Sequence, residues 1–312
     1  MRLRRSRQRM GILFLLGALI VTSSYPISPP RSQKSNDEAA RLFDYDRSAA
    51  FDVRDESAAR DENGVNIRDI SYAASAPGRG RLKAYLVRPV GKGSFAGLTF
   101  FHWYGEVNSN RNEFLEEASA LARQGAVSLL IQGYLPWSEP FTDLKADRRR
   151  IIEQTIEVRR AFDLLLAQPG VDPRRVGFVG HDYGAMYGSI VAGVEKRAKA
   201  YILVAGMGSF SDWSLKFWPA TAAAQGEEVY RRGMDAVDPV RYIARAAPAA
   251  LLFQFANSDK YISKATATAF FDAGSKPKQV AWYEAEHDLN VEAARRDRRV
   301  WLVRQLRLAK PK

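Results

Sequence analysis

The fold of this chain is decided by the stretch Val176-Gly177-Phe178-Val179-Gly180-His181-Asp182-Tyr183-Gly184-Ala185-Met186-Tyr187-Gly188. An apolar run ends in glycines and continues directly into small residues, which predicts a buried strand, a tight turn and the start of a helix. The pattern is typical of the nucleophile elbow, G-x-Nuc-x-G, in which small flanking residues let the backbone turn sharply above a parallel sheet. Asp182 stands at the nucleophile position, which serine usually occupies, so the function depends on the chemistry of a carboxylate there.

The sequence around this elbow predicts strands and helices in alternation. Residues 65–74 and 81–90 roughly alternate between apolar and polar side chains, as antiparallel strands at a sheet edge do. Short apolar runs predict buried strands, and apolar residues spaced three and four apart predict helices. The buried strands are 95–101, 126–131, the run before Gly180, 200–204, 249–255 and 279–283, and the helices are 112–123, 149–167, 184–194, 264–273 and 291–308. This order predicts an α/β fold with a mostly parallel central sheet and helices on both faces.

The amino-terminal residues have a different composition from the rest of the chain. Five arginines precede an uncharged apolar run from Gly11 to Val21, and a proline-rich piece ends at Pro30. These are the parts of a secretory signal, so we expect residues 1–30 to be a signal peptide or an N-terminal membrane anchor. The protein is then exported, to the periplasm or the medium. Residues 31–48 are polar and predict a flexible arm, and residues 49–312 predict one catalytic domain.

Composition and charge exclude several partners. The net charge is +12, of which the leader contributes five, and the other positive charges lie on arginine-rich helix faces with acids interleaved. Because no aromatic-basic stripe accompanies them, we expect solvated helix faces and no nucleic-acid partner. The chain has no cysteine, and no two histidines have metal-ligand spacing, so we expect no metal and no cofactor. The expected partner is a small-molecule substrate, and the oligomeric state stays open.

Polar residues at the ends of the predicted strands form the candidate site. In an open parallel sheet, ligands bind beyond the carboxyl ends of the strands. His102, His181 and His287 all fall at that edge, and Asp259 follows the strand before the last. A carboxylate nucleophile needs a base that activates water and an acid that orients the base. We therefore predict Asp182 as nucleophile, His287 as base and Asp259 as the orienting acid.

Several of these residues have a simpler alternative role. Asp182 could be a turn residue in a domain that has lost catalysis. Asp259 could cap the helix that begins near Ser263, and Glu106 or Asp288 could orient the base instead. His102 fits a structural hydrogen-bonding role better than proton transfer, and His181 fits support of the elbow.

The chain resembles the α/β-hydrolases from about Ile67 to Leu308, because elbow, strand context and the order nucleophile, acid, histidine agree. The short segment between Gly206 and Ala247, where a large cap could stand, implies a small lid and is similar to the dienelactone hydrolase-like branch. The elbow itself, Gly-His-Asp-Tyr-Gly, more closely resembles epoxide hydrolases and the haloalkane or fluoroacetate dehalogenases that use aspartate.

The resemblance also implies an oxyanion hole. One donor would be the backbone N–H of Tyr183, the residue after the nucleophile. The second N–H would come from the loop after His102, where Tyr104 is the expected donor and Trp103 the second choice.

The carboxylate at position 182 favours particular substrates. Attack by a carboxylate on an ester carbonyl would form a high-energy anhydride, whereas attack on a saturated carbon forms an alkyl ester that activated water can cleave. We therefore expect a small apolar electrophile of the epoxide or alkyl halide type, hydrolysed through an alkyl-enzyme ester. A tyrosine hydroxyl would assist an epoxide and an indole N–H a halide. The expected pocket residues are His102, Tyr134, Trp137 and Trp213.

Two other functions are compatible with the sequence. The first is a carboxylesterase or lactonase of the dienelactone hydrolase type, in which Asp182 acts as a base or an electrostatic group. The second is a non-catalytic α/β-hydrolase domain that binds a ligand or a protein.

Overall fold

The computed structural model describes residues 39–75, 80–103, 110–134, 141, 143–220 and 224–309. The predicted leader, residues 1–30, lies outside these residues, as do Tyr104, Glu106 and Trp137. None of the helices in the described ranges is long and apolar enough to cross a membrane.

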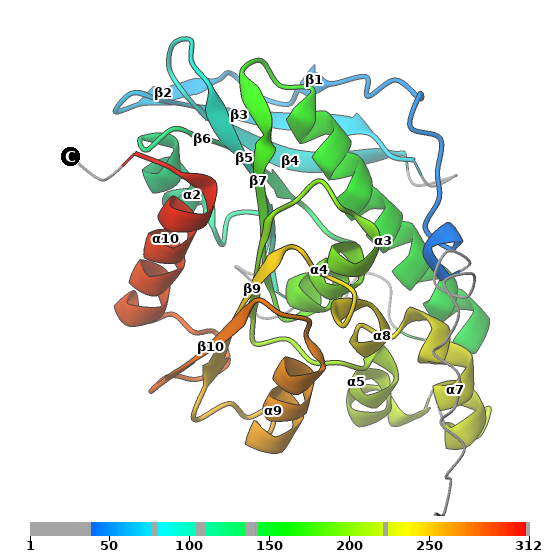
Figure 1. Cartoon of the computed structure of the whole chain (residues 1–312). Coiled ribbons are helices and arrows are strands. Elements are labelled where there is room, and N and C mark those ends of the chain that lie inside the picture. The colour runs from blue at the N-terminus through cyan, green and yellow to red at the C-terminus, as the bar shows by residue number, and fades with distance from the viewer. Residues whose placement is uncertain are drawn as a thin grey trace, which may run out of the picture.

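One ten-stranded sheet runs through the described part of the chain (Figure 1). Its order is β1-β3-β4-β6-β5-β7-β8-β9-β10, with β2 also paired to β3. The strands are β1 (Arg54–Asp55), β2 (Arg60–Glu62), β3 (Val65–Ala73), β4 (Arg81–Pro89), β5 (Phe95–Phe101), β6 (Ala126–Ile131), β7 (Val171–His181), β8 (Ala200–Val204), β9 (Ala250–Ala256) and β10 (Lys278–Tyr283). Strands β6, β5, β7, β8, β9 and β10 are parallel, while β1 to β4 pair antiparallel at the other edge. The predicted mostly parallel sheet is confirmed.

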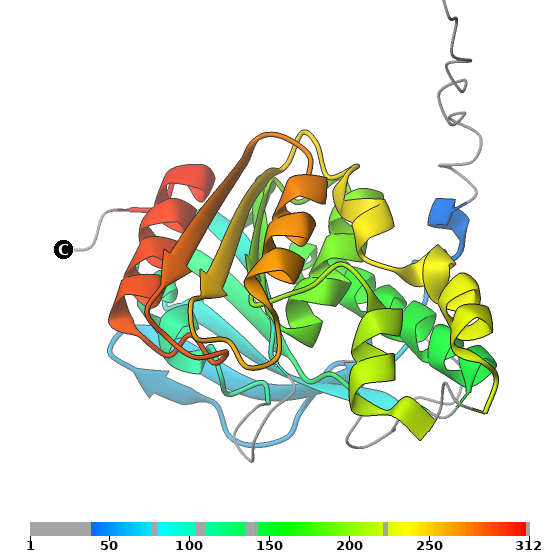
Figure 2. The same ribbon diagram turned by 90° about the horizontal axis from the view of Figure 1, so that it is seen from below.

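Helices cover both faces of this sheet, as the alternation predicts. The helices are α2 (Leu115–Ala122), α3 (Leu144–Leu166), α4 (Tyr183–Val194), α5 (Phe210–Phe217), α7 (Glu227–Met234), η1 (Asp235–Val237), α8 (Val240–Ile243), α9 (Lys264–Ala273) and α10 (Glu292–Leu306). Helices α2 and α10 share one apolar core with the sheet, and α3, α4 and α9 share the other. Figure 2 shows α10 on the opposite side of the sheet from α3, α5 and α7. The predicted three-layer arrangement is confirmed.

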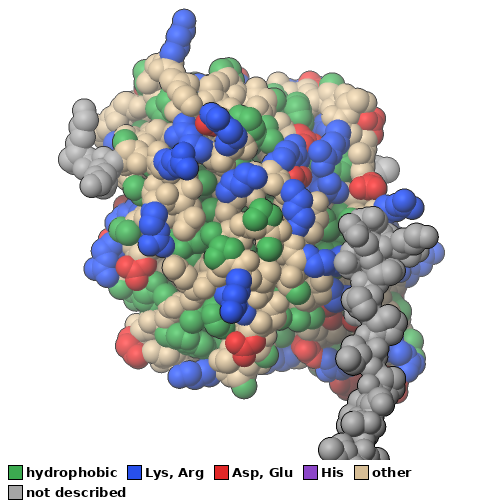
Figure 3. Space-filling model, viewed as in Figure 1, with side chains coloured by type: hydrophobic (Ala, Val, Ile, Leu, Met, Phe, Trp, Pro, Cys, Tyr) green, Lys and Arg blue, Asp and Glu red, His purple; other side chains and the backbone are tan. Residues whose placement is uncertain are grey.

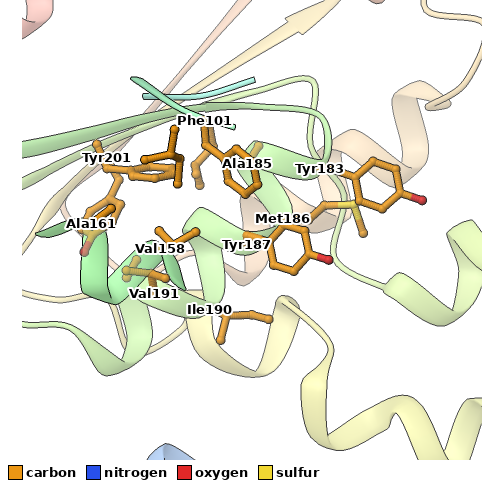
Figure 4. Close-up of a cluster of buried hydrophobic side chains, with 14 of the residues drawn as sticks. Phe101, Val158, Ala161, Tyr183, Ala185, Met186, Tyr187, Ile190, Val191 and Tyr201 are labelled. Atoms are coloured by element: carbon orange, nitrogen blue, oxygen red, sulfur yellow. The ribbon is translucent and has the colours of Figure 1, made fainter. Parts of the chain in front are cut away.

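Helix α4, which follows the elbow, is buried along nearly its whole length. Its residues from Tyr183 to Ala192 are all buried, and Figure 4 shows Tyr183, Tyr187 and Ile190 projecting from it. A helix that is apolar all round belongs in the interior of a protein. Small residues let it lie close to the sheet, since a Cβ atom on Gly188 would come within 2.2 Å of the Phe178 ring. The elbow is thus followed by a helix that is buried on every side over most of its length.

The segment between β8 and β9 differs from the sequence-based expectation. Residues 206–247 show no clear periodicity, yet they form α5, α7, η1 and α8. These helices have only three to eight residues, too few for a periodic apolar pattern to stand out. Contacts with the body stabilise them; for example, the buried Tyr230 hydroxyl donates to Asp147 Oδ2 at 2.9 Å.

The described part of the predicted arm, residues 39–48, is attached to the body at one buried side chain. Phe43 is fully buried and packs edge-on against Tyr242, with ring centroids 5.4 Å apart. The buried Arg160 donates to the carbonyl oxygens of Ala49, Ala50 and Ala73. Phe43 therefore anchors residues 39–48, and Arg160 holds the chain just after them at Ala49 and Ala50. Polar composition alone does not reveal either contact.

On the face shown in Figure 3, Lys and Arg side chains lie singly or in small groups among apolar, acidic and other side chains. Several of the described arginines pair with neighbouring carboxylates; for example, Arg175 Nε lies 3.3 Å from Asp172 Oδ2.

Candidate active site

Asp182 occupies a sharp turn between β7 and α4. Its backbone has φ 52° and ψ −112°, a conformation that costs a non-glycine residue about 1–3 kcal/mol. Its N–H donates to the Val204 carbonyl at 2.8 Å, and its carbonyl accepts from Met186 N–H at 3.0 Å. A Cβ on Gly180 would lie 2.3 Å from the Gly184 oxygen. The backbone therefore has the geometry of the nucleophile elbow.

The amino terminus of α4 lies directly behind this side chain. The helix begins at Tyr183, so the N–H groups of its first turn lack carbonyl partners within the helix. Such N–H groups carry partial positive charge and stabilise a nearby anion by about 0.3–1 kcal/mol, and more at buried sites. Tyr183, the donor that the resemblance implies, is the first residue of this helix.

His287 and Asp259 meet beside Asp182. His287 Nδ1 lies 2.8 Å from Asp259 Oδ2, and His287 Nε2 lies 3.8 Å from Asp182 Oδ1. The first distance is a hydrogen bond, and the second is longer than one. Such contacts are often long in a protein without its substrate and shorten during reaction. The structure thus brings together all three residues of the predicted triad.

The Asp259 carboxylate is held in a fixed orientation. Its Oδ1 accepts the N–H groups of Tyr261 and Ile262 at 2.8 and 2.9 Å, which leaves Oδ2 for His287. Burial raises the pKa of Asp259, but the hydrogen bond from His287, the charge of His287 and these two N–H groups together bring it below its ordinary value. Asp259 therefore stays ionised and keeps the Nδ1 proton of His287 in place, which directs Nε2 toward Asp182.

The alternatives for Asp259 find no support in the geometry. The cap of α9 is Ser263, which accepts the N–H of Thr266. Asp288 is exposed and accepts the N–H of Asn290, while Glu106 lies outside the described residues.

Aromatic rings enclose the imidazole of His287. The ring centroids of Tyr261, Trp103 and Trp213 lie 4.9, 5.6 and 6.3 Å from that of His287. The Asp182 side chain is 0% exposed and that of His287 is 4% exposed. Charges interact strongly in such a dry environment.

His102 connects the ends of β5 and β6. Its Nδ1 donates to the Trp103 carbonyl at 2.9 Å, and its Nε2 accepts the N–H of Gly133 at 3.0 Å. Burial lowers the pKa of His102 to about 4, although the Trp103 carbonyl opposes the shift. His102 is therefore a neutral structural residue beneath the loop after β5.

The remaining predicted residues are placed differently. The N–H of Trp103 donates to Glu113 Oε2 at 2.9 Å, so in this structure it is not directed at an oxyanion. Tyr104, the preferred second donor, and Trp137 lie outside the described residues. Tyr134 is half-buried beside the main core, and its N–H donates to Gln154. Trp213 lies on α5, and its ring centroid is 6.3 Å from that of His287.

Sequence reasoning missed two residues at the site. Glu113 bonds to both His181 and Trp103, and Tyr261 packs its ring against His287. Tyr261 follows Asp259 by two positions, so its place in the same loop was a usable signal. Glu113 precedes a helix far from the elbow in sequence and carries no such signal. Within the described ranges, no three His, Cys, Asp or Glu side chains are grouped as metal ligands.

Comparisons with known proteins give structural neighbours only. No protein-family model and no curated protein matches the sequence. The acetyl xylan esterase from Paenibacillus sp. R4 superposes with a TM-score of 0.70 at 18% identity, covering 88% of this chain and 94% of the esterase. Acetyl xylan esterase 1 from Thermoanaerobacterium sp. has a TM-score of 0.66 at 14% identity, covering 86% and 93% of the two chains. A putative dienelactone hydrolase from Klebsiella pneumoniae has a TM-score of 0.56 at 15% identity, covering 78% and 99%. With the elbow and the strand order, these likenesses show that the chain has the α/β-hydrolase fold.

Proposed function

We propose that this protein is a hydrolase in which Asp182, His287 and Asp259 act together on a small-molecule substrate. One observation carries the proposal: a strained elbow holds Asp182 3.8 Å from the imidazole of His287, and Asp259 orients that imidazole from 2.8 Å. Strained backbone of this kind persists only where the surrounding structure holds it in place, and it is found most often at functional sites. The esterases and hydrolase that share the fold support the same general activity.

The carboxylate side chain supports a first candidate, hydrolysis of an epoxide or alkyl halide. Asp182 attacks a saturated carbon, and the carbon–oxygen or carbon–halogen bond breaks as the alkyl-enzyme ester forms. Water then loses a proton to His287 and attacks the carbonyl carbon of that ester. The resulting oxyanion faces the N–H of Tyr183, and its collapse releases an alcohol and regenerates Asp182 with one oxygen from water. The indole N–H of Trp213, buried and without an acceptor among the described residues, could assist the leaving group.

The structural neighbours support a second candidate, hydrolysis of a carboxylic ester or lactone. The two acetyl xylan esterases have the TM-scores 0.70 and 0.66, and a dienelactone hydrolase shares the fold. In this route Asp182 forms no covalent bond, because an anhydride would result. His287 takes a proton from water, the hydroxide attacks the ester carbonyl, and Asp182 stabilises the imidazolium from its other side. The comparisons favour this candidate, and the side chain at position 182 favours the first.

Turnover in heavy-oxygen water separates the two candidates. The enzyme is incubated with styrene oxide, 1-bromobutane or p-nitrophenyl acetate, and the peptide containing Asp182 is weighed by mass spectrometry. Incorporation of heavy oxygen into Asp182 after several turnovers supports the alkyl-enzyme route. Label found only in the acid product supports direct attack by water on an ester. If Asp182→Asn and His287→Gln keep the full wild-type rate on every substrate, the hydrolase proposal fails and a binding domain becomes the better assignment.

We also propose that the protein is exported through its leader. N-terminal sequencing of the exported protein is expected to begin near Ser24 or Tyr25. An intact Met1 in the membrane fraction would instead identify an anchor.

A further inference from the structure

A second pair of a carboxylate and a histidine lies behind the candidate triad. His181 Nδ1 is 2.7 Å from Glu113 Oε1, and His181 Nε2 is 2.9 Å from the backbone carbonyl oxygen of His287. The other oxygen of Glu113 accepts the N–H of Trp103 at 2.9 Å. These contacts join the turn before α2, the loop after β5, the elbow and the loop after β10.

Both ring nitrogens of His181 face acceptors. A neutral imidazole has one N–H and can donate to only one of them, whereas an imidazolium donates to both. A carboxylate and a carbonyl oxygen cannot donate in return, so the hydrogen bonds are complete only when His181 carries a positive charge. His181 is 1% exposed, and a charge so deeply buried requires a partner, which Glu113 supplies.

The position of Trp103 is a separate observation in favour of this charge. Its indole ring stacks nearly parallel on His181, with 5.3 Å between centroids and 14° between planes. A cation over the face of an indole ring is stabilised by the electron-rich ring. Trp103 is thus attached to the pair twice, through its N–H to Glu113 and through its ring to His181.

We infer that Glu113 and His181 form a buried ion pair that positions His287 and Trp103. The pair thereby fixes the loop after β10 and the loop after β5 relative to one another. Neither residue touches Asp182 or Asp259 through a hydrogen bond that the structure contains, so both are positioning residues. The hydrogen bond from His181 to the His287 carbonyl fixes the backbone from which the imidazole reaches Asp259. The hydrogen bond from Trp103 N–H to Glu113 fixes Trp103, whose ring packs beside the imidazole of His287. The inference rests on the proposed function only for its effect on turnover.

Imidazole NMR tests the charge on His181 without any substrate. The chain has three histidines, so ¹⁵N-histidine labelling gives three ring spectra. At pH 7 we expect protons on both nitrogens of His181, and on Nδ1 alone of His102. In Glu113→Gln, which keeps the shape of the side chain and removes its charge, we expect His181 to lose one ring proton and the His287 signals to move. Glu116→Gln is the matched control, because Glu116 is an exposed glutamate three residues further along the same segment, and the change should leave all three spectra unchanged.

Kinetics add a readout that depends on positioning. With whichever of p-nitrophenyl acetate or styrene oxide the wild type turns over, we expect Glu113→Gln to lower kcat about 10-fold to 100-fold with little change in KM, because a small misplacement of reacting groups has that effect. Glu116→Gln should match the wild type. A wild-type His181 with one unprotonated nitrogen would overturn the inference, and so would a Glu113→Gln protein whose His287 signals stay in place. If Glu113→Gln does not fold, the wild-type spectrum decides. Failure of the proposed function would look different, since Asp182→Asn would then be fully active whatever the spectra show.

Discussion

Replacement of Asp182 by glycine and by alanine measures the strain stored in the elbow. At φ 52° and ψ −112° a residue with a Cβ atom pays about 1–3 kcal/mol, and glycine avoids this cost. Both variants lose the carboxylate, so the loss of its interaction with His287 cancels between them. Glycine also loses more chain entropy on folding, by roughly 0.5–1 kcal/mol. We therefore expect Asp182→Gly to be more stable than Asp182→Ala by about 1–2 kcal/mol.

Urea unfolding followed by circular dichroism measures this difference, and thermal unfolding should show it as a shift in Tm of roughly 2–8 °C. Ala192→Gly, later in α4, is the control in unstrained helix, where glycine is expected to cost about 1 kcal/mol or more. Both Asp182 variants should be inactive. The reasoning is refuted if Asp182→Gly is the less stable of the two by an amount similar to the control, because the elbow would then store no strain.

Three further predictions concern the triad, the elbow packing and acid stability. Asp259→Asn should lower kcat by about 10³-fold to 10⁴-fold, since the amide no longer holds the correct tautomer of His287, while steady-state assays of Asp288→Asn should match the wild type. Gly184→Ala should lower the free energy of unfolding, measured in urea, by about 3 kcal/mol or more, because its Cβ would lie 2.1 Å from a backbone oxygen. Gly208→Ala is the control and should cost clearly less, since its Cβ would lie 3.2 Å from a side chain. Equal losses in the two variants would contradict this account. Burial lowers the pKa of His102 to about 4, so between pH 6.5 and pH 4 the unfolded chain binds a proton that the native protein does not. Wild-type stability should fall by roughly 3 kcal/mol from this residue as pH drops through that window, and urea titrations of His102→Gln should lack that part of the decline.

The elbow could be predicted from the sequence because its requirements are local. Glycines at 180 and 184 stand on either side of Asp182, and each would place a Cβ against a backbone oxygen. The places of Asp259 and His287 were also predictable, because parallel strands in this order bring their carboxyl ends to one edge. Three buried strands, 95–101, 126–131 and 200–204, were predicted with their bounds, since buried strands are short apolar runs with clear ends. The predicted strands 65–74, 81–90, 249–255 and 279–283 differ from the observed bounds by no more than one residue at either end.

The features that could not be predicted depend on contacts between distant parts of the chain. Glu113 lies 68 residues before His181 and has no motif around it, so only the folded structure shows that the two are paired. The short helices between β8 and β9 lack a periodic pattern, and the few apolar residues around Phe43 in a mostly polar stretch form no pattern long enough to predict its burial. The hydrogen bond from Trp103 N–H to Glu113 is likewise a tertiary contact. Assigning oxyanion-hole donors by sequence position, from the resemblance, cannot reveal it.

The strand order separates the strands that carry the triad residues from the segment that supplies Trp213 beside them. Strands β7, β9 and β10 present Asp182, Asp259 and His287, whereas β8 lies between β7 and β9 and presents none of them. The chain leaves β8 at Val204 and returns at Ala250 after building α5 to α8, and this excursion supplies Trp213 to the site. The same excursion also supports the elbow, because Phe210 packs against Tyr183 and Tyr187 of α4. A graft between these two strands that is meant to change the surroundings of His287 therefore has to keep this contact with the helix that follows Asp182.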